Sequence, residues 1–91
     1  MQASIEISLY PLSENYENVI VDFLKSLKSQ NADLRIETNG LSTQIFGEYN
    51  TLMKLLQGEM KKVLEQNKAV FILKLSSGMR TPESVEGLLD K

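Results

Sequence analysis

The stretch IETNGLSTQIFGEY, from Ile36 to Tyr49, decides how this chain folds. Its Asn39-Gly40 pair is the strongest short-range signal for a β-hairpin, because both central residues of a type I′ turn need positive φ. A two-residue loop would pair Thr38 with Leu41 and Leu34 with Ile45. We therefore expect an apolar face of Leu34, Ile36, Thr38, Leu41, Thr43 and Ile45, and a second face of Arg35, Glu37, Ser42, Gln44 and Phe46.

On the N-terminal side of the hairpin the hydrophobic pattern changes period once. Apolar and polar residues alternate from Ile5 to Tyr10, which predicts a half-buried strand that ends at Pro11. After Ser13, a candidate N-cap, the apolar residues from Tyr16 to Leu27 follow the i, i+3, i+4, i+7 spacing of an amphipathic helix of about four turns.

On the C-terminal side a second apolar stripe from Tyr49 to Leu64 predicts another helix, and Glu48 at its start suits the helix dipole. The segment AVFILKL is then apolar on both sides from Ala69 to Leu73, so we expect a strand that is covered on both faces, or covered on one of them by a neighbouring protomer. Thr81 as N-cap and Pro82 at N1 predict a short third helix to about Leu89. We expect that helix to dock its apolar residues, which are Val85, Leu88 and Leu89.

The predicted order is therefore βαββαβ with a tail helix, in a single domain spanning residues 1–91. Right-handed crossovers then give an α+β, ferredoxin-like fold. Its antiparallel four-stranded sheet has the order 4-1-3-2, with two helices on one face and a short C-terminal helix. The opposite sheet face would be left bare and would carry Phe46, Val70 and Ile72 among polar residues. We therefore expect a homodimer or homotetramer formed through this open face.

The composition excludes several classes of function. Ten basic residues against twelve acidic ones give a net charge of −2 without a basic cluster, so we expect no nucleic-acid partner. The chain has no cysteine and no histidine, which removes the commonest nucleophile, general base and metal ligands, and we expect neither an enzyme nor a cofactor. Without a signal-like N-terminus or a long apolar run, a cytoplasmic protein with no membrane partner is expected.

Polar residues near the hairpin end are the candidate site. Thr38, Asn39, Ser42 and Thr43 offer hydrogen-bond donors and acceptors that could line a small pocket for a largely apolar ligand. The alternative is that the threonines simply favour strands and satisfy their hydroxyls locally, and the spacing leaves both interpretations open. Glu6 and Glu37 form a weak candidate for a catalytic carboxylate pair, because the other groups that catalysis needs are missing.

The chain resembles the YkoF-like thiamine-binding proteins, which are small ferredoxin-like domains. The resemblance rests on IEISLYPLSENY (5–16), on TNGLSTQIFGEYNTLM (38–53) and on the segment from Phe71 to Leu89. It implies a non-enzymatic protein that binds thiamine or its hydroxymethylpyrimidine moiety in uptake or salvage, and that assembles as dimers or tetramers through its sheets.

By position, Ser42 and Thr43 match the family motif, while Glu6 and Ser8 fall in the matched first strand. An aminopyrimidine offers donors and acceptors to such hydroxyls and amides. A cationic thiazolium is favoured beside a carboxylate, which Glu6, Glu37 or Glu48 could supply.

Three other functions are compatible with this order of elements. An amino-acid-binding regulatory domain shares the βαββαβ order, and a cofactor-free monooxygenase of the dimeric α+β barrel type uses polar and aromatic residues inside its barrel. A structural oligomer without a ligand is the third alternative.

Overall fold

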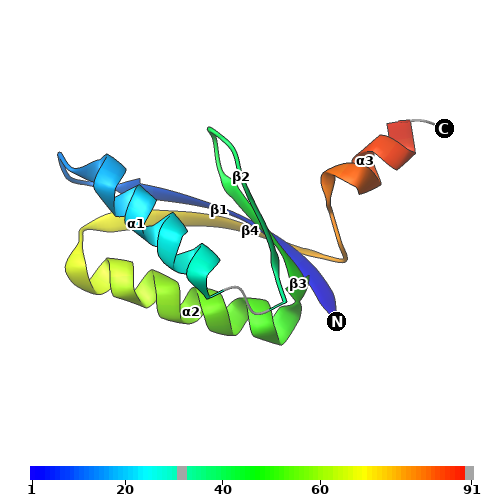
Figure 1. Ribbon diagram of the computed structural model, residues 1–91, viewed down its shortest axis with the longest axis horizontal. Helices are drawn as coiled ribbons and strands as arrows, with labels where there is room; N and C mark the ends of the chain where they lie inside the picture. The colour runs from blue at the N-terminus through cyan, green and yellow to red at the C-terminus, as the bar shows by residue number, and fades with distance from the viewer. Residues whose placement is uncertain (31–32, 90–91) are drawn as a thin grey trace.

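The structure is a computed structural model that describes residues 1–30 and 33–89. Along the chain the elements are β1 (Gln2–Pro11), α1 (Tyr16–Ser29), β2 (Arg35–Thr38), β3 (Thr43–Glu48), α2 (Tyr49–Gln66), β4 (Ala69–Ser77) and α3 (Pro82–Leu89). The strands form one antiparallel sheet in the order β2-β3-β1-β4, and α1 and α2 cover the same face (Figure 1). The predicted ferredoxin-like fold and its strand order are confirmed.

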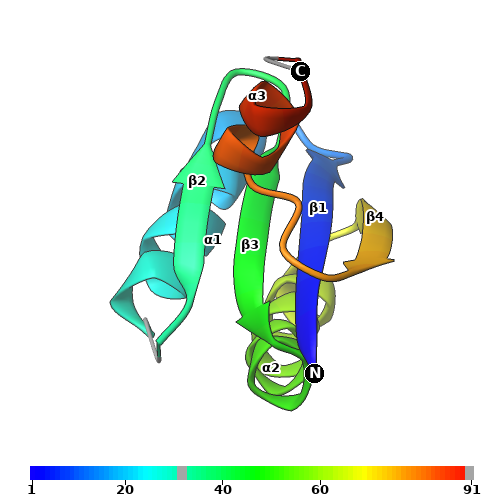
Figure 2. The same cartoon turned by 90° about the vertical axis from the view of Figure 1, so that its right-hand side faces the viewer.

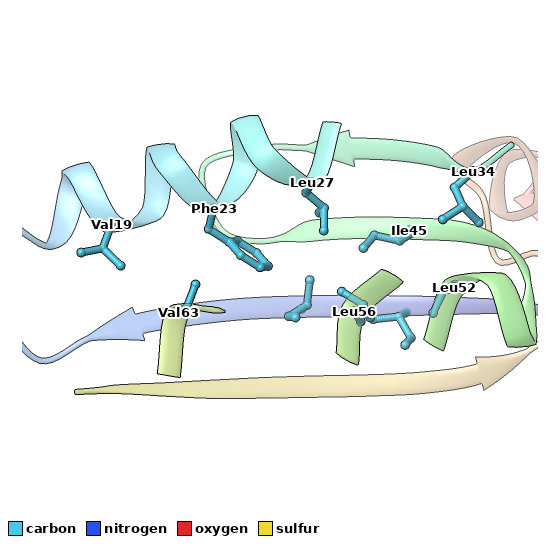
Figure 3. Close-up of a cluster of buried hydrophobic side chains, with 10 residues drawn as sticks. Val19, Phe23, Leu27, Leu34, Ile45, Leu52, Leu56 and Val63 are labelled. Carbon is cyan, nitrogen blue, oxygen red and sulfur yellow. The ribbon is translucent and has the colours of Figure 1, made fainter. Parts of the chain in front are cut away.

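The hydrophobic core lies between the sheet and these two helices. Ile5, Ile7 and Ile45 point from the strands toward α1 and α2, as the period of two predicts. Figure 3 shows the helix residues that meet them, with Phe23 and Leu27 from α1 and Leu52 and Leu56 from α2. Burial of each such side chain stabilises the fold by about 1.5–3 kcal/mol, so this cluster fixes how the helices lie on the sheet.

The predicted type I′ turn at Asn39-Gly40 is wrong. Positive φ occurs in the described residues at Asp33 and Gly78, and at neither of the two turn residues. Thr38 pairs with Thr43, so the loop is formed by residues 39–42. The Asn39 side chain explains the difference, because its Oδ1 accepts the backbone N–H groups of Leu41 (2.8 Å) and Ser42 (3.1 Å). Such a side-chain turn closes the loop without left-handed backbone.

The longer loop shifts the pairing by two residues, so that Ile36 faces Ile45 instead of Thr43. A shift of two keeps each side chain on its expected face, because side chains alternate with a period of two. The exception is Leu41, which was expected on the apolar face and is 90% exposed in the loop.

Two boundaries also differ from expectation. β1 runs through Pro11, which pairs with Ala69 at the end of the β1–β4 ladder. Asn15, not Ser13, is the N-cap residue of α1, and the Ser13 hydroxyl donates to Asn15 Oδ1 at 2.8 Å. Ser13 therefore supports the residue before the helix instead of capping it.

The outer face of the sheet is the face turned away from α1 and α2. It was expected to be bare, but part of it is covered. The chain after β4 crosses it, and the buried Ser4 hydroxyl donates to the Gly78 carbonyl (2.7 Å) and accepts the Arg80 N–H (2.8 Å). The Arg35 guanidinium lies 5.8 Å from the centre of the Phe46 ring, which is only 2% exposed. Figure 2 shows α3 in front of this face, with α1 and α2 behind the sheet.

The expected docking of α3 is also wrong. Its apolar residues are more than half exposed, and they are Val85, Leu88 and Leu89. The first turn is attached to the sheet through a 2.9 Å ion pair between Arg35 and Glu83, and the rest of α3 projects away from the body (Figure 1). Within residues 1–30 and 33–89, no helix is long and apolar enough to cross a membrane.

Candidate functional site

A cavity opens where β1 and the β2–β3 hairpin separate. The last pair between β1 and β3 is Ile7 with Thr43, whereas β1 continues to Pro11 paired with β4 alone. The cavity left beside residues 8–10 has a volume of about 140 Å³ and is called the hairpin cavity here. Ile20, Phe23 and Leu24 of α1 line it on one side, and the polar residues Ser8, Thr38, Asn39, Ser42 and Thr43 line it on the other.

The two threonines of the cavity lie opposite each other across the hairpin. Their Oγ1 atoms are 3.0 Å apart, and Thr43 is buried. One of the two interpretations left open by the sequence was that the hydroxyls are satisfied locally. The hydrogen bond between the two threonines agrees with it and uses one of the two hydroxyl protons. A pair of hydroxyls has two protons and spare lone pairs, so one O–H can still donate to a bound molecule. The threonines can serve both roles.

Asn39 and Ser42 are held in place by their neighbours. Because the carbonyl oxygen of the Asn39 side chain accepts two loop N–H groups, its NH₂ group is left as a donor. The Ser42 hydroxyl donates to Glu6 Oε2 at 3.2 Å, and Lys74 Nζ lies 3.6 Å from Glu6 Oε1. Glu6 therefore acts on the cavity through Ser42, as a carboxylate that is already paired with a cation.

A second cavity, here called the outer cavity, adjoins the first on the outer face. It has a volume of about 430 Å³ and is lined by Glu37, Thr38, Asn39, Gln44 and Pro82. Thr38 and Asn39 border both cavities, so a ligand that extends past these two residues can reach from one to the other.

Arg35 controls the charge beside the outer cavity. Its guanidinium lies 2.6 Å from Glu37 Oε1 and donates two hydrogen bonds of 2.9 Å to the Glu83 carboxylate. These bonds, first those to Glu83 and then those to Glu37, raise the pKa of Arg35 above its ordinary value. They also lower the pKa of Glu83 to about 2. Arg35 and Glu83 therefore both stay charged near neutral pH.

Glu48 is the predicted site residue that the structure does not bring to the others. It lies at the far end of β3 from Thr43 and is the N-cap of α2, where its carboxylate accepts the N–H groups of Asn50 (3.0 Å) and Thr51 (3.2 Å). These bonds, above all the one from Asn50, hold its pKa below the ordinary value. The expected interaction with the helix dipole is thus present as a direct cap.

Sequence reasoning missed the apolar wall of the hairpin cavity and the part that the tail plays in the outer cavity. Ile20 and Leu24 are four residues apart on α1, so the helical stripe places them on one flank of that helix. That spacing could have indicated the wall. No local signal places Pro82 beside Glu37, because the contact joins distant parts of the chain.

The comparison with family models decides the relationship of this chain to known proteins. The model of the YkoF-related family matches residues 2–79, which include every strand and both helices of the core. The chain belongs to the YkoF-related family. The resemblance seen in the sequence is thereby confirmed. No curated protein matches this YkoF-related chain significantly.

Solved structures show the same fold. A Streptococcus pneumoniae protein is 22% identical over the whole of both chains, with a TM-score of 0.77. A Thermotoga maritima protein proposed to act in thiamine biosynthesis or salvage is 17% identical, with 97% of this chain and 99% of that one covered and a TM-score of 0.81. A Bacillus cereus domain of unknown function is 14% identical, covers 92% of this chain and 86% of its own, and has a TM-score of 0.73.

Proposed function

We propose that this protein binds thiamine or its hydroxymethylpyrimidine moiety, without catalysing a reaction, as part of vitamin salvage or uptake in the cytoplasm. The observation that carries the proposal is the hairpin cavity, because five of the predicted polar site residues surround it and an apolar helix flank closes it. These five are Ser8, Thr38, Asn39, Ser42 and Thr43. Family membership and the Thermotoga maritima neighbour support the choice of ligand.

The size of the hairpin cavity favours the pyrimidine half of the vitamin. Its volume of about 140 Å³ is close to that of cavities, about 150 Å³, that accommodate one six-membered aromatic ring. Ile20, Phe23 and Leu24 would contact the ring, while the threonine hydroxyls and the Asn39 amide would bind its nitrogen atoms and amino group. The pyrimidine therefore enters this cavity, and the thiazolium lies outside it.

The cationic thiazolium fits the outer cavity. Glu37 lines this cavity, and the other residues that line it, which are Thr38, Asn39, Gln44 and Pro82, carry no charge. A carboxylate in the lining favours a cationic ring. A thiamine molecule would thus extend past Thr38 and Asn39, with its pyrimidine inside the hairpin cavity and its charged ring beside Glu37.

A binding role without catalysis is supported by the way the carboxylates are used. Glu6 contacts Lys74 and the Ser42 hydroxyl, and Glu37 contacts Arg35, which is the arrangement of ion pairs. The sequence contains neither histidine nor cysteine to act as base or nucleophile.

Isothermal titration with thiamine and with hydroxymethylpyrimidine tests the proposal. Replacing Thr43 by Val keeps the volume but removes a hydroxyl from the cavity, and we expect the affinity for both ligands to fall about tenfold. Thr51→Val on α2 is the matched control, because Thr51 lies at the far end of β3 beside Glu48. Absence of heat with both ligands at millimolar concentration in the wild-type protein would overturn the proposal.

We also infer that the protein assembles as a homodimer or homotetramer, with β4 at the contact. β4 is an edge strand of the sheet, and on the two sides of it Val70, Ile72 and Leu75 are 45%, 55% and 53% exposed. An edge with free backbone groups and apolar side chains is suited to pairing with another copy. Analytical ultracentrifugation should show an oligomer that Ile72→Lys dissociates, and a wild-type monomer at high micromolar concentration would refute the assembly.

A further inference from the structure

The start of α1 and the end of α2 lie at the same end of the molecule (Figure 1). A third cavity lies between the two helices at this end. Its volume is about 300 Å³, and we call it the interhelix cavity. It lies on the opposite flank of α1 from the hairpin cavity, with Phe23 bordering both. Neither the fold nor the proposed vitamin site accounts for its polar lining.

A charged cluster lies at one end of this cavity. Glu59 is only 4% exposed, and its Oε2 lies 2.5 Å from Lys62 Nζ. The Ser26 hydroxyl donates to Glu59 Oε1 and accepts a hydrogen bond from Lys62 Nζ at 2.8 Å. A buried carboxylate costs free energy unless it is paired, and an apolar side chain here would often be at least as stable. The chain nevertheless keeps a negative group at this position.

The electrostatics of the rest of the cavity also favour positive charge. Asp22 adds a second carboxylate against the one cation, Lys62, so the lining has a net charge of −1. The C-terminal end of α2 borders the cavity through Val63, Gln66 and Asn67, and its last turn contains no basic residue. Such a helix end carries a partial negative charge. Asn18 and Gln66 provide further side-chain oxygen acceptors.

The cavity also has an apolar part. Val19 of α1 and Val63 of α2 are each 8% exposed, and both line the cavity. Figure 3 shows these two side chains and Phe23 directed toward the space between the helices and the sheet. A ligand that fits must therefore combine positive charge with a short apolar segment.

We propose that the interhelix cavity binds a small alkyl diammonium cation of the polyamine class. One ammonium group would lie beside Asp22 and the amide oxygens of α1, and the other beside the carbonyl end of α2. The methylene chain between them would cover Val19 and Val63. This site is separate from the hairpin cavity and takes a different ligand.

Putrescine is the probe, with butane-1,4-diol and succinate as neutral and anionic compounds of the same chain length. In ¹H–¹⁵N NMR titrations of the full chain at constant ionic strength, putrescine should produce saturable shifts at residues 15–26 and 59–67, and the other two compounds should not. Thr43→Val should leave this titration unchanged, which distinguishes it from the vitamin site.

Asp22→Asn should weaken putrescine binding about fivefold, the upper range for a partly exposed ion pair. Glu65→Gln is the matched control, because it removes one negative charge from an exposed position of α2 that does not line the cavity. Asp22 is exposed, so its replacement should preserve the fold, and the melting temperature verifies this. If Asp22→Asn and Glu65→Gln weakened putrescine binding equally, or if putrescine shifted the NMR signals no more than butanediol does, the proposal would be overturned.

Discussion

Replacing Gly47 by Ala is expected to destabilise the fold, because the added Cβ would collide with the side chain of Leu34. A Cβ at this position would lie 2.2 Å from Cδ2 of Leu34 and 3.6 Å from the Asp33 carbonyl oxygen. Carbon atoms pack best at about 3.5–4.0 Å, so Leu34 would have to move by more than about 1 Å. Leu34 is only 6% exposed and cannot turn into solvent without losing its core contacts.

The cost of such overpacking is typically about 1–3 kcal/mol, and we expect about 2 kcal/mol here. For a domain of this size that corresponds to a fall in Tm of about 8–16 °C. Urea denaturation should show the change as a lower midpoint with an unchanged slope, because the surface exposed on unfolding stays the same. Gly58→Ala is the control, since nothing lies within 4 Å of its Cβ position, and it should stabilise α2 by up to about 1 kcal/mol.

A double-mutant cycle isolates the cause. Leu34→Ala alone should cost about 2–5 kcal/mol, because it leaves a cavity in the core. In the double variant the new Cβ of residue 47 fills part of that space. The destabilisation of the double variant should therefore be about 1–2 kcal/mol smaller than the sum of the two single destabilisations. Strict additivity, or a Gly47→Ala variant as stable as the wild type, would refute the reasoning.

Three other replacements test how the tail and α2 are attached. Arg35→Gln should speed amide hydrogen exchange in α3. Arg35 holds the pKa of Glu83 at about 2, below the ordinary 4.5, so the stabilisation from this ion pair is complete above about pH 4.5 and is lost as the pH falls toward 2. The Tm values of variant and wild type should therefore converge at low pH. Glu48→Ala should lower Tm at pH 7, and this difference should shrink in acid as the wild-type carboxylate, whose folded pKa is lowered mainly by the Asn50 N–H, becomes protonated. Ser4→Ala should cost about 1–3 kcal/mol in urea denaturation, because it leaves a tail carbonyl and a tail N–H without their partner.

Several features of the site follow from patterns within one element. Alternation predicts Ser42 on the outer face and Thr43 on the core face, and the structure agrees even though the hairpin register differs, because Ser42 binds Glu6 of the outer face and Thr43 is buried. Faces survive a register shift of two, whereas the partner of each residue does not. The family motif around Ser42 and Thr43 is likewise a local pattern, and it predicts a site at the hairpin end of the sheet.

Other features depend on atoms that the sequence does not place side by side. The loop could close in two ways, and the Asn39 side chain settled the choice by binding two N–H groups. The hairpin cavity exists because β1 extends past its last pair with β3, and no residue type signals where a ladder stops.

The sequence by itself determined the order of the elements, their buried faces and the fold class, because periods of 2 and 3.6 residues report burial locally. The tertiary structure alone decided that Phe46 is buried and that the tail reaches the edge of the outer cavity. That outcome rests on Ser4 binding Gly78 and Arg35 binding Glu83, which are pairs 74 and 48 residues apart. Contacts over such separations depend on the geometry of the whole sheet, and this is why the outer face was expected to be open.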